Sequence, residues 1–207
     1  MKIIRKTLTL MIASFLIMTS EASASFTDVP APYKAPVDYM VDNGFSGGIS
    51  STQFGVQLSI KRVDAAVMLA KALKLNVQTA PESGFTDVPA RAQKEVNAMK
   101  EAGIISGKTA ASFGANQTLT RGEMALILVR AYKLSGTAQH RFTDVPGRYR
   151  QAVEALLANE VTYGKTPTSF GTAEAIKRGE FALLLYRIAM AQPGPEDELI
   201  PEVIGIN

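Results

Sequence analysis

Three arginines, each followed two positions later by an acidic residue, are the groups in this 207-residue sequence whose type and spacing could do chemistry. The arginines are separated by 59 and 57 residues and are Arg62, Arg121 and Arg178. A guanidinium group offers a planar set of donors that matches a carboxylate in shape and charge. The pattern therefore predicts a corner that binds an anionic group, present three times in the chain.

The acids that follow the arginines have a structural explanation that needs no ligand. Thr120 and Glu123 have the spacing of a capping box, in which the hydroxyl accepts from one backbone N–H and the carboxylate from another. An acid in the first turn also suits the positive end of the helix dipole, which applies to Asp64 and Glu180 as well. We interpret these four residues as helix-capping or structural.

The same dipole disfavours a cation in the first turn, so helix capping does not explain the arginines. Lys61 and Lys177 precede two of them and add a second cation at each place. We expect the guanidinium groups to face outward into clefts, where free N–H groups at the helix start add donors for an anion. A bridge between an arginine and a carboxylate of another repeat is the alternative.

The elements that must position these residues form an internal triplication. The string FTDVP occurs at 26–30, 85–89 and 142–146, and Phe-Gly pairs begin at positions 54, 113 and 170. Both landmarks keep the offsets of the arginines, which indicates three tandem copies of one unit. We predict units at 25–80, 81–137 and 138–192, which pool their apolar faces in one shared core.

Each unit is predicted to be a helix, a loop and a second helix. Apolar residues recur at spacings of three and four, and in the second copy the later stripe is Met124, Ile127, Leu128, Ala131 and Leu134. Gly44 and Gly103 are placed to end the first helix of their units, whereas Glu160 stands there in the third, so we expect a different ending. No long alternating strand pattern occurs, and the predicted fold class is all-α.

The first 24 residues have the order of a secretory signal peptide. The basic MKIIRK precedes the uncharged run TLTLMIASFLIMTS, and ASA at 22–24 has the small residues of a cleavage site. We predict a secreted protein with no membrane segment after cleavage. The formal charge of the whole chain is +3 and becomes nearly balanced without the leader. Residues 193–207 are predicted to form an acidic, flexible tail.

The repeated strings together resemble the S-layer homology domain. The hallmark of that family is a Thr-Arg-Ala-Glu-type motif that opens the second main helix, and Thr120-Arg121-Gly122-Glu123 matches it best. Lys61 and Lys177 replace the threonine in the other copies. The resemblance covers roughly residues 26–190 and implies a pseudo-threefold, three-pronged assembly around a central bundle of the motif helices, with ligand in the grooves between prongs.

The resemblance also implies a function, which is non-covalent attachment to the anionic secondary cell-wall polysaccharide of Gram-positive bacteria. The recognised group is typically a pyruvylated amino sugar, whose ketal carries a carboxylate. The implied ligand-binding residues are the motif arginines, the two adjoining lysines and three aligned glycines, namely Arg62, Arg121, Arg178, Lys61, Lys177, Gly48, Gly107 and Gly164. Not all three grooves need bind, and the groove containing Arg121 is the first candidate because its motif is the most typical.

Two sets of these residues also have structural interpretations. The three glycines either let the backbone approach a sugar ring or simply make turns. The aspartates of the FTDVP strings are expected to brace that turn through their own backbone, and they are Asp28, Asp87 and Asp144.

Other functions have less support in the sequence. It has no Cys, which excludes disulfides and thiol nucleophiles, and His140 is the one histidine, with no second metal ligand spaced around it. We predict no enzyme activity, cofactor or metal, and a wall-associated hydrolase is the less favoured alternative. The nearly balanced charge argues against a nucleic-acid partner. The main alternative is a structural or protein-interaction module of the surface layer that has lost sugar binding and contacts another surface protein.

Overall fold

A computed structural model describes residues 26–191 of the chain. The predicted signal peptide and the predicted acidic tail lie outside these residues. Within them the regular elements are helices, joined by loops that form only isolated β-bridges. The all-α class is confirmed. Over the same residues, none of the helices has the length and hydropathy required to span a bilayer.

Each predicted unit contains two α-helices, and the second begins at the motif arginine. In chain order the elements are η1 (Ala31–Tyr33), α1 (Lys34–Asp42), α2 (Arg62–Ala72), η2 (Ala90–Ala92), α3 (Gln93–Glu101), α4 (Arg121–Tyr132), α5 (Gly147–Ala158) and α6 (Arg178–Ala191). We call α2, α4 and α6 the motif helices. The residue boundaries of the units remain a prediction.

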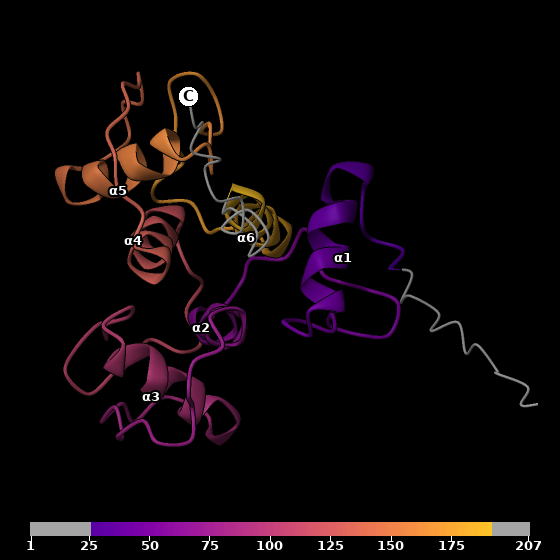
Figure 1. The fold of residues 1–207 in the computed structure, drawn as a ribbon, viewed down its shortest axis with the longest axis vertical. Coiled ribbons are helices and arrows are strands. Elements are labelled where there is room, and N and C mark those ends of the chain that lie inside the picture. The colour runs from indigo at the N-terminus through magenta and orange to yellow at the C-terminus, as the bar shows by residue number, and fades with distance from the viewer. Residues whose placement is uncertain (1–25, 192–207) are drawn as a thin grey trace, which may run out of the picture.

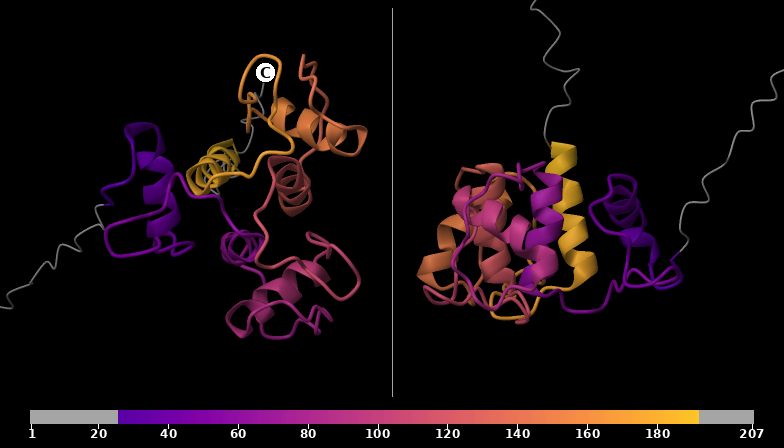
Figure 2. Two further views of the ribbon diagram at one scale, coloured as in Figure 1. Left: turned by 180° about the vertical axis from the view of Figure 1, so that it is seen from behind. Right: turned by 90° about the horizontal axis from the view of Figure 1, so that it is seen from below.

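The helices pair between units. Helix α2 packs against α3, α4 against α5, and α6 against α1, so the last unit closes onto the first. Figure 1 views the motif helices nearly along their axes and shows the three pairs, with α1, α3 and α5 lying across the view. The right-hand view of Figure 2 shows the motif helices with roughly parallel axes. These pairs are compatible with the predicted three-pronged shape.

The loops that precede the motif helices are joined in a closed ring of backbone hydrogen bonds. The Ile60 N–H donates to the Ile176 carbonyl at 3.0 Å, the Leu119 N–H to the Ile60 carbonyl at 3.0 Å, and the Ile176 N–H to the Leu119 carbonyl at 2.9 Å. All three side chains are buried in the shared core. Because each residue donates to one neighbour and accepts from the other, the ring needs all three copies.

The first helix of each unit ends in the same way, which corrects one expectation. Gly44 and Gly103 both have φ of +69°, and Glu160 has φ of +57°, so all three adopt the left-handed conformation. In the third unit the Val161 N–H then donates to the Leu156 carbonyl at 2.9 Å, and the Val161 side chain is buried. Burial of this apolar residue after the turn offsets the strain at Glu160.

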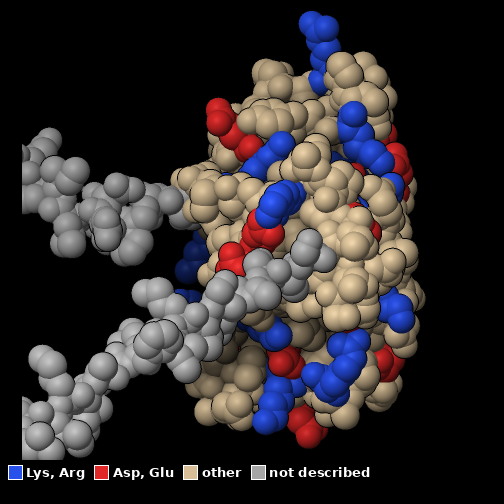
Figure 3. Space-filling view, turned by 90° about the vertical axis from the view of Figure 1, so that its right-hand side faces the viewer, with Lys and Arg blue, Asp and Glu red and all other residues tan. Residues whose placement is uncertain are grey.

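Charged side chains on one face of the molecule lie in small groups. On the face shown in Figure 3, basic and acidic residues are interspersed on a mostly uncharged surface. Charge on this face is therefore not gathered into one stripe, and the local surroundings of individual cations decide what they can bind.

Candidate ligand-binding site

Each motif arginine is buried and ties its helix to the following unit in the closed order. Arg121, which is 4% exposed, donates from Nε to the Phe170 carbonyl at 2.8 Å, and its guanidinium carbon lies 5.0 Å from the centroid of that ring. The two equivalent pairs, with Nε–O distances of 3.0 and 2.8 Å, are Arg62 with Phe113 and Arg178 with Phe54.

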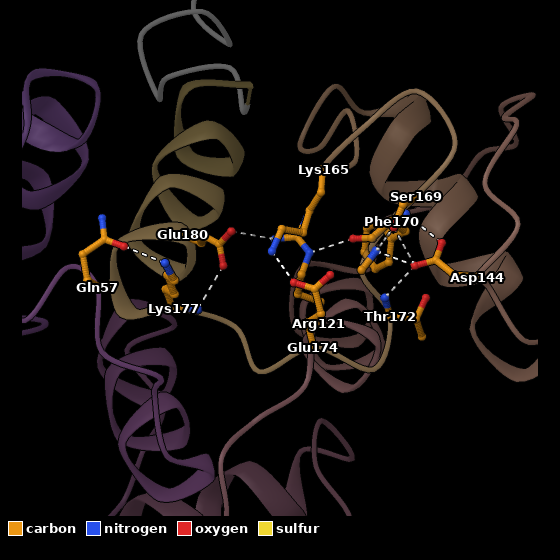
Figure 4. Close-up of polar contacts among 11 residues, drawn as sticks. Gln57, Arg121, Asp144, Lys165, Ser169, Phe170, Thr172, Glu174, Lys177 and Glu180 are labelled. Carbon is orange, nitrogen blue, oxygen red and sulfur yellow. Dashed lines mark hydrogen bonds and ion pairs between the residues drawn. The ribbon is translucent and has the colours of Figure 1, made fainter.

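Two of the three arginines also face a carboxylate from the next motif helix. Arg121 Nη1 lies 3.6 Å from Glu180 Oε1, and Figure 4 shows the guanidinium group between Glu180 and the Phe170 carbonyl. Arg62 Nη1 lies 3.4 Å from Glu123 Oε2. The bridge between repeats, offered above as the alternative, is therefore present at these two junctions.

The third junction, between the last and first units, lacks such a pair. The acid on α2 is Asp64, whose carboxylate contacts Arg91 Nη2 at 2.8 Å. Among residues 26–191 no carboxylate lies within 4 Å of Arg178, whose Nη2 donates to the Ser46 hydroxyl. Burial lowers the pKa of the Arg178 guanidinium, and the Asp64 and Asp28 carboxylates act in the opposite direction.

The motif arginines are buried, although Arg62 and Arg121 still line the cavities described below. The expectation of free helix N–H groups beside them was wrong. The Arg121 N–H donates to the Glu174 carbonyl at 2.9 Å and the Gly122 N–H to the Thr172 carbonyl at 3.0 Å. The first two N–H groups of α2 and α6 donate in the same way to the loops that follow them in the closed order. The loop of the neighbouring unit covers the start of each motif helix, so these donors are not available to an anion.

The start of α4 has the expected capping box. The Glu123 N–H donates to Thr120 Oγ1 at 3.2 Å, and the Thr120 N–H donates to Glu123 Oε2 at 3.2 Å. At α6 the Lys177 N–H donates to Glu180 Oε2 at 3.0 Å, although lysine has no hydroxyl to return the bond. Glu123 and Glu180 thus combine a role at the helix start with the contact to the preceding arginine.

The aspartates of the FTDVP strings hold the Phe-Gly loops. Asp87 accepts from the N–H groups of Phe113, Gly114 and Ala115 at 2.7, 2.7 and 3.0 Å. The equivalent acceptors are Asp28 and Asp144. Burial acts to raise the pKa of Asp87, but these N–H groups outweigh it and lower the pKa to about 2. The expected bracing within the FTDVP turn is corrected, because the bonds reach a loop of the same unit 26 to 28 residues later.

Two cavities lie at equivalent junctions between units. The first, which we call the Arg62 cavity, has a volume of about 180 Å³, and the second, the Arg121 cavity, about 270 Å³. Residues at equivalent repeat positions line both, and in the Arg62 cavity they are Arg62, Gly107, Lys108, Glu123, Arg130 and Tyr149. Their counterparts in the Arg121 cavity are Arg121, Gly164, Lys165, Glu180, Arg187 and Tyr33.

The tyrosines fit against glycines of the motif helices. A Cβ added at Gly122 would come within 3.1 Å of the Tyr149 ring, and one at Gly179 within 3.2 Å of Tyr33. Between α2 and α3 the equivalent helix position is occupied by a larger residue and the facing position by a smaller one, which are Val63 and Ala92. A tyrosine ring packs on a helix glycine at two places, and at the third place a valine on the helix faces an alanine instead.

The predicted ligand-binding residues fall into three groups, of which the first, Arg178 and Gly48, lines neither of the two cavities. Arg62, Arg121, Gly107 and Gly164 line the cavities, whereas Lys61 and Lys177 are exposed and line neither. Lys177 Nζ instead donates to Gln57 at 2.7 Å (Figure 4).

The aligned glycines also have a packing role. A Cβ at Gly48 would lie 2.7 Å from the Phe26 ring, and one at Gly107 or Gly164 would collide with the corresponding FTDVP phenylalanine. The turn interpretation of these glycines therefore has a definite steric cause.

The lysines and tyrosines that line the cavities were not predicted from the sequence. Lys108 and Lys165 each follow one of the aligned glycines, and Tyr33 and Tyr149 occupy equivalent positions before the first helix of their units or at its start. The repeat offset was the signal that could have identified them. This signal was incomplete, because the first copy has Ile49 in place of the lysine and the second copy has Ala92 in place of the tyrosine.

The S-layer homology domain matches residues 84–125 and 141–182, which include Arg121 and Arg178. An S-layer protein of Bacillus licheniformis is 31% identical over 166 residues, covering 76% of this chain and 19% of that protein. S-layer protein EA1 of Bacillus anthracis is 30% identical over 166 residues with the same shares. An endoglucanase of Bacillus sp. (strain KSM-635) is 40% identical over 86 residues, which are 42% of this chain and 9% of the enzyme. The chain belongs to the S-layer homology family.

The family match and these relatives support the predicted location at the bacterial cell surface. The chain spans about a fifth of the length of the S-layer proteins named above. The first unit lies outside the two matched segments, so its assignment as a third S-layer homology repeat remains a prediction. Its Asp28 contacts and its helix pairing are those of the other units.

Proposed function

We propose that this protein attaches non-covalently to an anionic secondary cell-wall polysaccharide of a Gram-positive envelope, which it binds in the Arg62 and Arg121 cavities. The observation that carries the proposal is the recurrence of arginine, lysine, glycine and tyrosine around both cavities. A pyruvylated amino sugar suits this set, because its carboxylate can accept from the cations while its ring packs on a tyrosine. The family and the S-layer relatives support the same function.

Arg121 has hydrogen-bonding capacity left for such a ligand. Its Nε is used by the Phe170 carbonyl and its Nη1 faces Glu180, but within the described part of the chain its Nη2 makes no hydrogen bond. Lys165 lies at the same cavity and pairs with Glu174 through a side chain that is one-third exposed. Such partly exposed pairs contribute little to stability, so Lys165 can exchange its partner for a ligand carboxylate.

The third place, where Arg178 stands at the position equivalent to Arg62 and Arg121, is proposed not to bind sugar. Ile49 replaces the cavity lysine, and Ala92 replaces the tyrosine. The carboxylate of Asp64 forms an ion pair with Arg91. The junction therefore keeps the buried arginine that ties the units together but lacks the cation and the aromatic ring that a carboxylated sugar needs.

Co-sedimentation with purified Gram-positive sacculi tests the proposal. A double variant, Lys108→Ile with Lys165→Ile, copies what the chain already has at Ile49 and removes one cation from each cavity. The matched control, Lys61→Ile with Lys177→Ile, removes the same charge from exposed lysines outside the cavities. We expect the cavity variant to lose at least tenfold in wall binding and the control less than twofold.

Two results would count against polysaccharide attachment. Equal pelleting with sacculi stripped of the secondary polymer would remove the polysaccharide as the ligand. Equal losses for the cavity variant and its control would show that general charge, and not the cavities, governs binding. Absence of any wall binding would instead favour the structural or protein-interaction module.

A further inference from the structure

The two cavities differ in the number of cations that the protein leaves without an acidic partner. In the Arg62 cavity the carboxylate of Glu123 is occupied by Lys108 and by Arg62, while Arg130 and Arg148 also line the space. Among the described residues neither Arg130 nor Arg148 lies within 4 Å of a carboxylate. Two exposed guanidinium groups therefore border this cavity with their charge uncompensated.

The Arg121 cavity has one such cation. Arg187 is the counterpart of Arg130, and it donates from Nη1 to the Val161 carbonyl at 3.2 Å and lies 5.1 Å over the ring of Tyr163. The position equivalent to Arg148 is Pro32, which carries no charge. The cavities thus share one set of residues and differ by one guanidinium group.

Arg148 is held in place beside the cavity. Its guanidinium carbon lies 4.6 Å from the centroid of the Tyr149 ring, and Tyr149 is itself buried against the start of α4. A cation over an aromatic face is attracted by the electron density of the ring, which restricts the side chain without using its hydrogen-bond donors. Within residues 26–191 these donors make no hydrogen bond, so they are available at the rim of the cavity.

We infer that the Arg62 cavity recognises a segment of the polymer that bears two acidic groups, whereas the Arg121 cavity recognises one. This rests on the proposed function, because it concerns the same polysaccharide. A cavity of about 180 Å³ is smaller than those that enclose a whole drug-sized ligand, so it holds little more than one sugar. The first acidic group enters beside Lys108 and Arg130, and the second, on the adjoining sugar at the rim, meets Arg148.

The test measures the affinity of each cavity separately by NMR. The amide signals of Gly107 and Gly164 report the Arg62 and Arg121 cavities, respectively. The probes are the methyl glycoside of a pyruvylated amino sugar, with one carboxylate, and a disaccharide in which both sugars carry a pyruvate ketal. One added charge contact at an exposed site is expected to raise affinity about threefold to fivefold.

At Gly107 we expect the two-carboxylate probe to bind about threefold to fivefold more tightly than the one-carboxylate probe, and at Gly164 we expect less than a twofold difference. Arg148→Ala should abolish the preference at Gly107 without weakening the one-carboxylate probe, and Arg148→Lys should restore part of it. Arg91→Ala, at the equivalent position of the preceding unit, is the matched control and should change neither value.

The outcomes separate this inference from the proposed function. An undiminished preference at Gly107 in Arg148→Ala, or an equal preference at Gly164, would overturn the two-charge assignment while leaving polysaccharide attachment intact. If neither amide signal moves with either probe, the proposed function fails, and the assignment of two acidic groups fails with it.

Discussion

Replacing Arg121 by alanine is expected to destabilise the fold strongly, whatever it does to ligand binding. The side chain is 4% exposed and connects the start of α4 to the loop that contains Phe170. Alanine removes the donor to the Phe170 carbonyl and the cation over the Phe170 ring, and it leaves the Glu180 carboxylate without its guanidinium partner. All three losses fall on the contact between the second and third units.

The size of the effect follows from the individual contacts. A hydrogen bond from a charged donor contributes about 1.5 to 3 kcal/mol. A desolvated cation over an aromatic ring contributes about 1 to 2 kcal/mol. The loss should therefore be about 3 to 5 kcal/mol, which lies at the upper end of what single substitutions produce. Arg121→Lys keeps the charge but not the planar group, so its loss should be roughly half as large.

Urea unfolding followed by circular dichroism measures this loss. With a slope of about 2 kcal/mol per molar urea, the midpoint should fall by roughly 2 M. Lys165→Ile is the control from the same cavity, because its side chain makes a partly exposed ion pair, and its change should stay within about 0.5 kcal/mol. A single transition is expected in each case, since the ring through Ile60, Leu119 and Ile176 makes the units interdependent.

One result would refute this reasoning. If Arg121→Ala unfolds within about 1 kcal/mol of the parent protein while its helix content is unchanged, the contacts with Phe170 do not hold the units together. The arginine would then be free to act mainly on ligand, and its loss should appear as weaker wall binding per folded molecule.

Three further predictions concern the supporting contacts. Asp87→Asn should lower the free energy of unfolding by about 1 to 2 kcal/mol after allowance for solvent screening. The contribution of Asp87 to stability should be complete above about pH 4 and be lost as the pH drops toward 2, because its lowered pKa means that the folded state binds fewer protons there. Urea midpoints between pH 2 and 5 should therefore fall less steeply in Asp87→Asn than in the parent protein, while Asp28 and Asp144, whose pKa values are also lowered, keep part of the dependence. Gly107→Ala should cost about 1 to 3 kcal/mol in the same assay, since the added Cβ meets the Phe85 ring. Thr120→Ala should cost about 1 kcal/mol of stability and leave wall binding per folded molecule unchanged.

The helices and the triplication could be predicted from the sequence because their signals are local or periodic. Apolar spacing marks each helix, and Thr120 with Glu123 marks the start of α4 through contacts three residues apart. The offsets also contained information that was not used. The motif arginines and the phenylalanines of the Phe-Gly pairs recur with the same offsets. In the structure each arginine contacts the phenylalanine of the following unit, as Arg62 contacts Phe113.

The surroundings of the arginines could not be predicted, because they depend on how units pair in space. The unfavourable helix dipole indicates that Arg121 serves something other than its own helix, but it contains no information on its partner, which is a carbonyl 49 residues away. The N–H groups at the helix start were expected to be free because an isolated helix leaves them unpaired. In the folded chain, carbonyl groups of the next unit occupy them.

The number of binding cavities is not dictated by the number of repeats. Closure of the ring requires three copies, and each copy supplies a buried arginine for it, so the motif arginine is retained at all three junctions. Lys108 and Lys165 are not needed for closure, because the first unit closes with isoleucine at that position. Residues that recur in all three copies therefore report on assembly, and residues that recur in only two copies are the better candidates for ligand recognition.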